Sequence, residues 1–308
     1  MSHPSARPVV VAVADEHDTA LRYAAGEAVR DRRPLRVVHV VHPPRGGPGP
    51  ETVLVTFEAA EQAAQELLDD LAQRALQLVA GQVPVQRRLC RGPAVEALLE
   101  QCADADRLVL QRRHGPRLDR ILTGSTVAGL AARAPVRIVS VPERWQGAHP
   151  DPRVTVALGD RDEGSREEVL LSLAFAEAEA RAASLTVLHA WYLPAEYGDA
   201  GIDRRTLEHW QDVSRQDLEQ HLVPWREAHP SVDVRVDVPH LRPVDAIVRA
   251  SEHSDLLLVA RRRSHGVVHL GSVVRTAVRK SRCPLVVVTP DTKVRDLATP
   301  HEGVGIEP

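Results

Sequence analysis

The chain has 308 residues, of which 43% are hydrophobic, 26% are charged and 3% are aromatic, and its formal net charge is −3. This composition excludes a disordered chain and favours about two domains with cores built from Ala, Val and Leu. So small a net charge gives no general attraction to nucleic acid or anionic membranes, and no apolar run approaches the ~20 residues of a membrane span.

The cysteines and the start of the chain indicate the compartment. Cys90, Cys102 and Cys283 are odd in number and lack the spacing of metal ligands. The opening "MSHPSARPVVVAVADEHD" has a short apolar stretch followed by acidic residues, which is not the layout of a signal peptide. We therefore expect a cytoplasmic protein with reduced cysteines, no bound metal, and neither a membrane nor a nucleic acid as partner.

The first half alternates apolar runs with amphipathic segments. The β-branched run Val9–Val13 precedes the helical pattern "TALRYAAGEAVRD" and a strand that carries His39. A long helix is expected over Glu58–Ala80, a short strand over Val83–Arg87 and a further helix at "PAVEALLEQCA". A Leu/Val run, a loop, a helix that begins with Gly-Ser and a last apolar strand complete the order β-α-β-α-β-α-β-α-β.

The second half repeats this order. "LRVVHVVHPP" matches "LTVLHAWYLP", "ADRLVLQRR" matches "SDLLLVARR", and "TGSTVAGLAARAPVRIVSV" matches "LGSVVRTAVRKSRCPLVVV". The long helical segment Thr206–His229 is interrupted by Pro224. The repeat and the Pro- and Gly-containing join predict domains over residues 1–142 and 153–290, a linker over 143–152 and a flexible tail over 291–308.

Apolar strands that alternate with amphipathic helices indicate an α/β fold with a parallel sheet covered on both faces. Ligands of such folds bind beyond the carboxyl ends of the strands, where the strand order reverses. Each half therefore offers one candidate site at that edge of its sheet.

The ordered pieces "LTVLHAWYLP", "RGPAVEALLEQCADADRLVL" and "LGSVVRTAVRKSRCPLVVV" resemble the universal stress protein family, in both halves. The resemblance implies two tandem domains, each a five-stranded parallel sheet sandwiched by helices in an adenine nucleotide alpha hydrolase-like fold. It further implies that Arg137–Val141 pairs with Leu285–Thr289, so that one chain forms an intramolecular pseudo-dimer. Whether two chains pair further stays open.

Members of this family that bind ATP carry the pattern Gly-x2-Gly-x9-Gly-(Ser/Thr). Here Gln111 and Ala260 stand at the first glycine position, while the final Gly-Ser pairs are intact. The resemblance places the candidate nucleotide-binding residues at Asp15, Val40, Gly115, Gly124, Ser125 and Thr126 in the first half, and at Asp160, Ala190, Gly266, Gly271 and Ser272 in the second.

Arginines replace the missing glycines in both loops. They are Arg112, Arg113, Arg261, Arg262 and Arg263. One interpretation is that these guanidinium groups contact phosphate by charge-assisted hydrogen bonds, and the other is that they are solvated. The Gly-Ser pairs likewise allow two interpretations, the remnant of a phosphate loop or an ordinary helix N-cap.

Other conspicuous residues favour structural roles. His39 and His189 occupy equivalent strand positions and are expected to be packed and hydrogen-bonded. His265 and His269 lack a third ligand nearby in the sequence, so no metal site is expected. The acidic residues before the fourth strand of each half, Asp104, Asp106 and Asp255, are expected at turns or helix ends.

Trp210 and Trp225, in the long helical segment of the second half, either pack on the sheet or form a cap or partner surface. No catalytic motif is present, so no catalytic residue is assigned.

Three functions remain open at this stage. The first is a stress-response protein that binds adenine nucleotide, with ATP as the candidate ligand, and does not turn it over quickly. The second is a regulatory or scaffold protein without nucleotide that acts through protein partners. The third is a slow ATPase.

Overall fold

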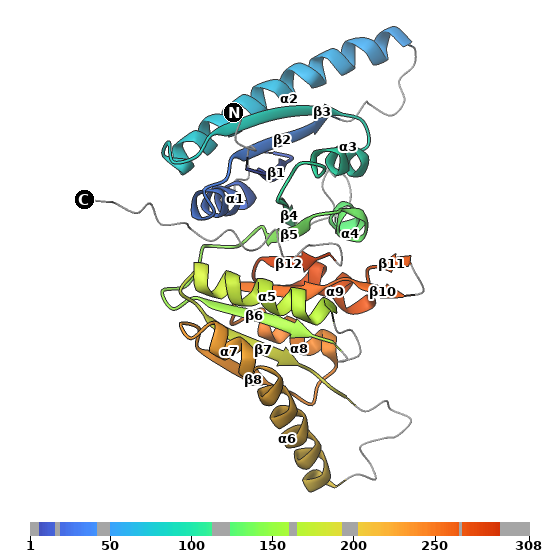
Figure 1. Ribbon diagram of the computed structural model, residues 1–308. Helices are drawn as coiled ribbons and strands as arrows, with labels where there is room; N and C mark the ends of the chain where they lie inside the picture. Colours follow the sequence, from blue (N-terminus) through green and yellow to red (C-terminus); the bar gives the residue numbers. More distant parts are fainter. Residues whose placement is uncertain are drawn as a thin grey trace, which may run out of the picture.

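The strands of both halves join one ten-stranded sheet, with the order β3-β2-β1-β4-β5-β12-β9-β6-β7-β8 (Figure 1). The computed structural model describes residues 6–15, 19–41, 50–112, 124–159, 165–192, 203–264 and 267–289. Each half contributes five parallel strands in the same relative order, which confirms the predicted α/β fold.

The first half consists of nine elements that follow the predicted order. They are β1 (Val9–Val13), α1 (Thr19–Arg30), β2 (Leu35–Val41), α2 (Pro50–Val79), β3 (Val85–Arg91), α3 (Ala94–Gln101), β4 (Arg107–Arg112), α4 (Gly124–Arg133) and β5 (Arg137–Pro142).

The second half repeats these elements and adds a small hairpin where a loop was expected. Its elements are β6 (Arg153–Leu158), α5 (Ser165–Ala180), β7 (Ser184–His189), α6 (Arg204–His221), α7 (Val223–Ala228), β8 (Val234–Asp237), α8 (Pro243–Ala250), β9 (Leu256–Ala260), β10 (Arg262–Ser264), β11 (Val267–His269), α9 (Ser272–Lys280) and β12 (Leu285–Val288).

The predicted break in the long helical segment lies between α6 and α7. Pro224 occupies the first turn of α7, where the missing amide hydrogen of proline costs nothing. The first half has one unbroken long helix at this place, and it begins at Pro50 rather than Glu58. The strand predicted over Val83–Arg87 is also displaced, to Val85–Arg91, because Pro84 precedes it and its pairing continues along β2.

Both faces of the sheet are covered by helices, and each face has a core that continues from one domain into the other. Val9, Val11 and Val13 point into one core, which α1, α2 and α5 cover. Val10 and Ala12 point into the opposite core, which α3, α4, α8 and α9 cover. This alternation explains why the strands read as continuous apolar runs. None of the helices in the described ranges is long and apolar enough to cross a membrane.

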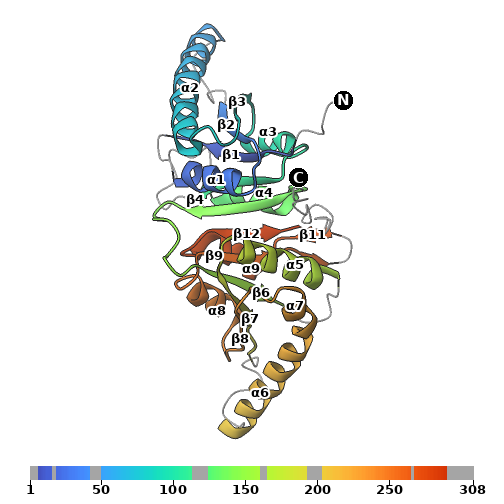
Figure 2. The same ribbon diagram turned by 60° about the vertical axis from the view of Figure 1, so that its left-hand side comes forward.

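The two domains meet where β5 and β12 pair, as the turned view shows (Figure 2). This pairing is antiparallel, with Val139 opposite Val286, Ser140 opposite Leu285 and Ile138 opposite Val287. The prediction of an intramolecular pseudo-dimer joined through the last strands is therefore confirmed. Because each terminal strand covers the other, neither presents an open edge.

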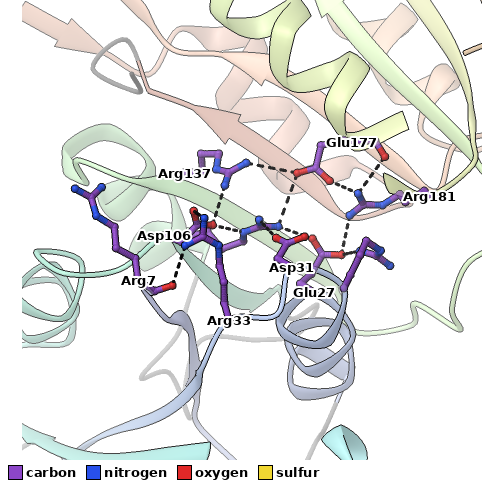
Figure 3. A network of polar contacts seen from close by, with 10 residues as sticks. Arg7, Glu27, Asp31, Arg33, Asp106, Arg137, Glu177 and Arg181 are labelled. Atoms are coloured by element: carbon purple, nitrogen blue, oxygen red, sulfur yellow. Dashed lines mark hydrogen bonds and ion pairs between the residues drawn. The ribbon is translucent and has the colours of Figure 1, made fainter. Parts of the chain in front are cut away.

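A buried ionic network lies beside this strand pair, between α1 and α5 (Figure 3). Arg107 Nη1 donates to Glu27 Oε2 at 2.6 Å, and Arg181 Nη2 donates to Glu27 Oε1 at 2.7 Å. Arg137 Nη2 donates to Asp106 Oδ2 at 2.7 Å, and Arg137 Nη1 lies 3.5 Å from Glu177 Oε1. The network joins the domains because Glu177 and Arg181 come from the second one.

Candidate functional site

A cavity of about 430 Å³ lies at the carboxyl ends of the second domain's strands. Leu158 and Gly159 follow β6 into its wall, Ala190 follows β7, and Ala260 ends β9. β6 and β9 are neighbours in the sheet, and the chain leaves them in opposite directions, toward β7 and β12. The cavity is therefore at the reversal of strand order, where this class of sheet binds ligands, and its volume is in the range of small-molecule sites.

Aromatic and aliphatic side chains form much of the wall. Trp191 stacks on His240 at a ring-centroid distance of 4.4 Å and meets Trp210 edge-on at 6.3 Å. Trp191 Nε1 is buried and has no hydrogen-bond partner within the described ranges. Tyr192 also lines the cavity and is half exposed. The wall thus offers flat apolar surface together with one unused donor, which suits an aromatic heterocycle.

The helix α9 points its amino terminus at the cavity. Gly271, Ser272, Val273 and Val274 all line it. Gly271 is the N-cap residue, and no side chain from the described residues caps the helix. Ser272 is the first helical residue, so the glycine of this pair, and not the serine, is the N-cap. The amide groups of the first turn therefore remain available to an anion.

Neither backbone conformation nor packing requires glycine at position 271. Its φ of −55° suits any residue. A Cβ added there would meet no atom within 4 Å. The glycine instead leaves the approach to the helix terminus open, as a ligand at this place would need.

One acidic group stands on the cavity wall. Glu167, near the start of α5, lies 2.9 Å from His221 Nε2 at the end of α6. A carboxylate at this position favours a hydroxyl or amino group of a ligand over a phosphate, because it accepts hydrogen bonds and repels anions.

The corresponding place in the first domain is partly filled by the chain itself. By strand register Gln111 is the counterpart of Ala260. The side chain of Gln111 is buried, and its Oε1 lies 3.5 Å from the backbone nitrogen of Ala20, which would donate to it at the start of α1. Val40 is buried in the core, and Asp15 is half-buried just after β1. The two halves therefore differ at this strand end.

Two of the arginines considered as phosphate contacts are engaged elsewhere. Arg112 Nη1 donates to the carbonyl of Val278 at 3.1 Å, and its Nη2 donates to Ser281 O. Arg261 Nη1 donates to Ala131 O at 3.0 Å, and its Nη2 donates to Ala134 O at 3.3 Å. Both side chains are buried, so neither the phosphate contact nor the solvated interpretation fits them.

These contacts cap helix ends across the domain interface. Arg112 comes from the first domain and holds the carboxyl terminus of α9 in the second, while Arg261 does the reverse for α4. A cation at this end of a helix is stabilised by the free carbonyls and the helix dipole. Burial nevertheless lowers the pKa of Arg112 to about 10.

Some of the remaining predicted residues lie in described elements, and others lie outside the described residues. Gly124, Ser125 and Thr126 form the first turn of α4, where Thr126 is buried. Arg262 lies in β10. Arg113, Gly115, Asp160 and Gly266 lie outside the described residues. Across the part of the chain that the structure describes, no group of three or more His, Cys, Asp or Glu could hold a metal ion.

The sequence identified Ala190, Gly271 and Ser272 at the cavity but missed most of its wall. The missed residues include Leu158, Glu167, Leu170, Leu188, Trp191, Tyr192, Pro243, Ile247 and Val259. Trp191 and Tyr192 directly follow Ala190, so an aromatic pair just beyond a strand end was the signal available.

The histidines and the acidic residues before the fourth strands have structural partners. His39 Nδ1 lies 2.9 Å from Val13 O and is buried, as expected. Burial lowers the pKa of this histidine. Asp104 contacts Arg36, and Asp255 accepts from the backbone nitrogens of His149 and Arg153.

Two α/β domains with this strand order, an internal pseudo-twofold and a cavity at the order reversal define a tandem protein of the doubly wound α/β class. The model of the universal stress protein family matches residues 5–142 and 153–289. The chain belongs to the universal stress protein family.

Similar proteins cover nearly the whole chain. A universal stress protein of Mycolicibacterium smegmatis is 30% identical over 284 residues, which are 89% of this chain and 94% of that protein. One of Mycobacterium tuberculosis is 29% identical over 276 residues, or 87% and 91% of the two chains. A crystal structure of a universal stress protein from Archaeoglobus fulgidus shares the fold, with a TM-score of 0.65, 15% identity, and 92% and 97% of the two chains covered.

Proposed function

We propose that this universal stress protein binds an adenine nucleotide in the cavity of its second domain and holds it without rapid turnover. The observation that carries the proposal is the uncapped amino terminus of α9 at a partly apolar cavity. The base would lie against Trp191 and Tyr192, and the phosphates would extend toward Gly271 and Ser272.

The division of charge in the cavity supports this orientation. Glu167 stands apart from α9, on a different helix, and could accept hydrogen bonds from ribose hydroxyls. The phosphates would be held by the amide groups of α9 rather than by Arg112 and Arg261, which cap helices. The cytoplasmic location and a role in stress responses belong to this proposal.

Gly271→Asp is a sharp test, because it should act in opposite directions on stability and on binding. Aspartate is a favourable N-cap residue, and there is space for its Cβ. The domain should therefore fold normally, and its free energy of unfolding should rise by up to ~1 kcal/mol. The same carboxylate would repel phosphate, so we expect ATP affinity to fall at least tenfold. Isothermal titration with ATP and thermal unfolding of the same samples measure both effects.

Ser125→Ala and Ser272→Ala are matched changes in the two halves. We expect Ser272→Ala to weaken ATP binding more than Ser125→Ala, because the first half is partly filled by Gln111. Unchanged ATP affinity in both Gly271→Asp and Ser272→Ala, or absence of binding at millimolar ATP, would refute the proposal. Phosphate release followed in the same mixtures tests the alternative of a slow ATPase.

A further inference from the structure

The second domain has another hollow, at the opposite ends of its strands from the nucleotide cavity. It has a volume of about 310 Å³ and lies beside α8. Its floor comes from the amino-terminal parts of β6 and β7, and β8 forms one side. No part of the proposed nucleotide site contributes to it.

The floor of this hollow carries hydroxyl groups. Thr155 and Ser254 are buried, and their side-chain oxygens lie 2.7 Å apart in a hydrogen bond. Ser184 and Thr186 are half-buried beside them. Ser254 Oγ donates to Ala250 O at 2.8 Å, so Thr155 donates to Ser254 and both of these hydroxyl groups are engaged. The hydroxyl groups of Ser184 and Thr186 can donate hydrogen bonds to a bound anion.

The rim of the hollow is basic. Arg153, Arg235 and Arg249 line it from three different elements, together with His253, against one acidic residue, Asp237. Arg235 Nη2 forms an ion pair with Asp233 Oδ2 at 3.1 Å, and both side chains are mainly exposed. Arg153 and Arg249 have no ion pair within the described ranges. Three guanidinium groups thus face one carboxylate.

At the corresponding place in the first domain, an acidic residue of the chain neutralises the charge of an arginine. There Arg36 Nη1 and Nη2 donate to the two carboxylate oxygens of Asp104 at 2.7 and 2.8 Å. Arg36 Nε donates to Gln86 Oε1 at 3.1 Å. Arg36 is buried, and this bidentate pair neutralises its charge.

Strand register identifies the counterparts of these residues. Thr186 corresponds to Arg36, and Arg235 corresponds to Gln86. His253 lies three residues before the start of β9, and Asp104 lies three residues before the start of β4, so these two residues also correspond. The second domain therefore lacks the internal acid–base pair of the first domain at this place and carries an additional arginine on the rim, whose ion pair with Asp233 is mainly exposed to solvent.

We propose that this hollow binds a small polyanion with two adjacent phosphate groups. Guanidinium groups on β6, β8 and α8 surround the hollow from several sides, which suits an anion with charge at more than one point. Arginine forms paired, charge-assisted hydrogen bonds with phosphate, and the hydroxyl floor supplies further donors. The proposal is independent of nucleotide binding at the first cavity.

Titration of the full chain with inorganic pyrophosphate tests the proposal. We expect Arg235→Gln combined with Arg249→Gln to lower the affinity for pyrophosphate at least tenfold. Arg204→Gln combined with Arg205→Gln removes an equal charge at exposed sites on α6 and should leave the affinity unchanged. An equal loss of affinity in this control variant and in the variant with Arg235→Gln and Arg249→Gln would indicate general charge attraction and overturn the proposal.

A second variant tests the site without removing an arginine. Thr186→Arg combined with His253→Asp would install the ion pair of the first domain in the second, so the hollow should fill and pyrophosphate binding should be lost. Far-ultraviolet circular dichroism checks that this variant folds. Gly271→Asp, in contrast, should retain pyrophosphate binding. Loss of binding in Gly271→Asp, undiminished binding in the double variant, or no binding to the original chain would each overturn the proposal.

Discussion

Glu27 is a single buried residue on which ion pairs from both domains converge. Arg30 and Arg107 contact it from the first domain, and Arg181 contacts it from the second. Burial by itself would raise the pKa of Glu27, but Arg181, Arg107 and Arg30 outweigh burial and lower it to about 2. The carboxylate is thus charged in the folded protein, and the surrounding guanidinium groups depend on that charge.

Glu27→Gln should destabilise the chain strongly. The substitution keeps the shape of the side chain but leaves buried arginines without a counter-charge, for which we expect a loss of roughly 3–5 kcal/mol in the free energy of unfolding. Chemical denaturation at pH 7 measures it. Glu208→Gln removes the partner of Arg204 in an exposed pair and should cost less than ~0.5 kcal/mol. Equal losses in the two variants would show that the buried network contributes no more to the free energy of unfolding than an exposed ion pair does.

The same residue predicts a pH dependence. The pKa of Glu27 is lower in the folded chain than its ordinary value of 4.5. The unfolded chain therefore binds a proton first as the pH falls, so the stability that Glu27 contributes is complete above about pH 4.5 and is lost toward pH 2. Between pH 5 and pH 3 the stability of Glu27→Gln should fall less steeply than that of the original chain. Parallel slopes in denaturation series over this range would contradict the assignment.

The helix α9 links the proposed nucleotide cavity of the second domain to the first domain. Its amino terminus lines the cavity, and its last carbonyls accept hydrogen bonds from Arg112. The helix is only nine residues long, so its two ends are close enough to move as one body. Nucleotide binding at one end is therefore expected to depend on the cap at the other.

Arg112→Met should loosen α9 although the residue belongs to the first domain. Methionine keeps much of the packing but leaves the carbonyls of Val278 and Ser281 without this donor. This loss should lower the free energy of unfolding by roughly 1–3 kcal/mol. Hydrogen exchange should become faster in the last turn of α9, while α4, which Arg261 caps, should change little. Arg261→Met should show the reverse pattern. Faster exchange spread evenly over both helices would argue against separate cross-domain caps.

At the scale of elements, the sequence pattern was sufficient for the order of the main helices and strands but not for the hairpin of β10 and β11, and the pairing of β5 with β12 was implied by the family resemblance. Apolar alternation and the internal repeat are local signals, and each domain's terminal strand is apolar enough to need cover. The destinations of Arg112 and Arg261 could not be predicted, because a run of arginines beside a glycine loop looks the same whether it meets phosphate or a helix end. The contact of Arg112 with Val278 joins residues far apart in sequence, and only the packed interface decides it.

Across the whole molecule, the two halves are alike in fold but complementary in charge. Strand register makes Leu256 the counterpart of Arg107, and the helix alignment makes Arg181 the counterpart of Asp31. The first half therefore supplies Arg107 and Arg137 to the interface network, while the second supplies Glu177 and Arg181. Two copies of one half would not reproduce these contacts, so the tandem chain has an interface between unlike partners.

Separate fragments of residues 1–150 and 151–308 should accordingly prefer each other to themselves. Each fragment exposes a terminal strand that needs a partner. In a pair of two first halves, Asp31 would occupy the place of Arg181 and put a carboxylate near Glu27 instead of a guanidinium group. Native mass spectrometry of an equimolar mixture should therefore show mainly the mixed pair. A statistical mixture of all three pairs would mean that strand pairing alone joins the domains, and two stable monomers would mean that the apolar strands need no cover.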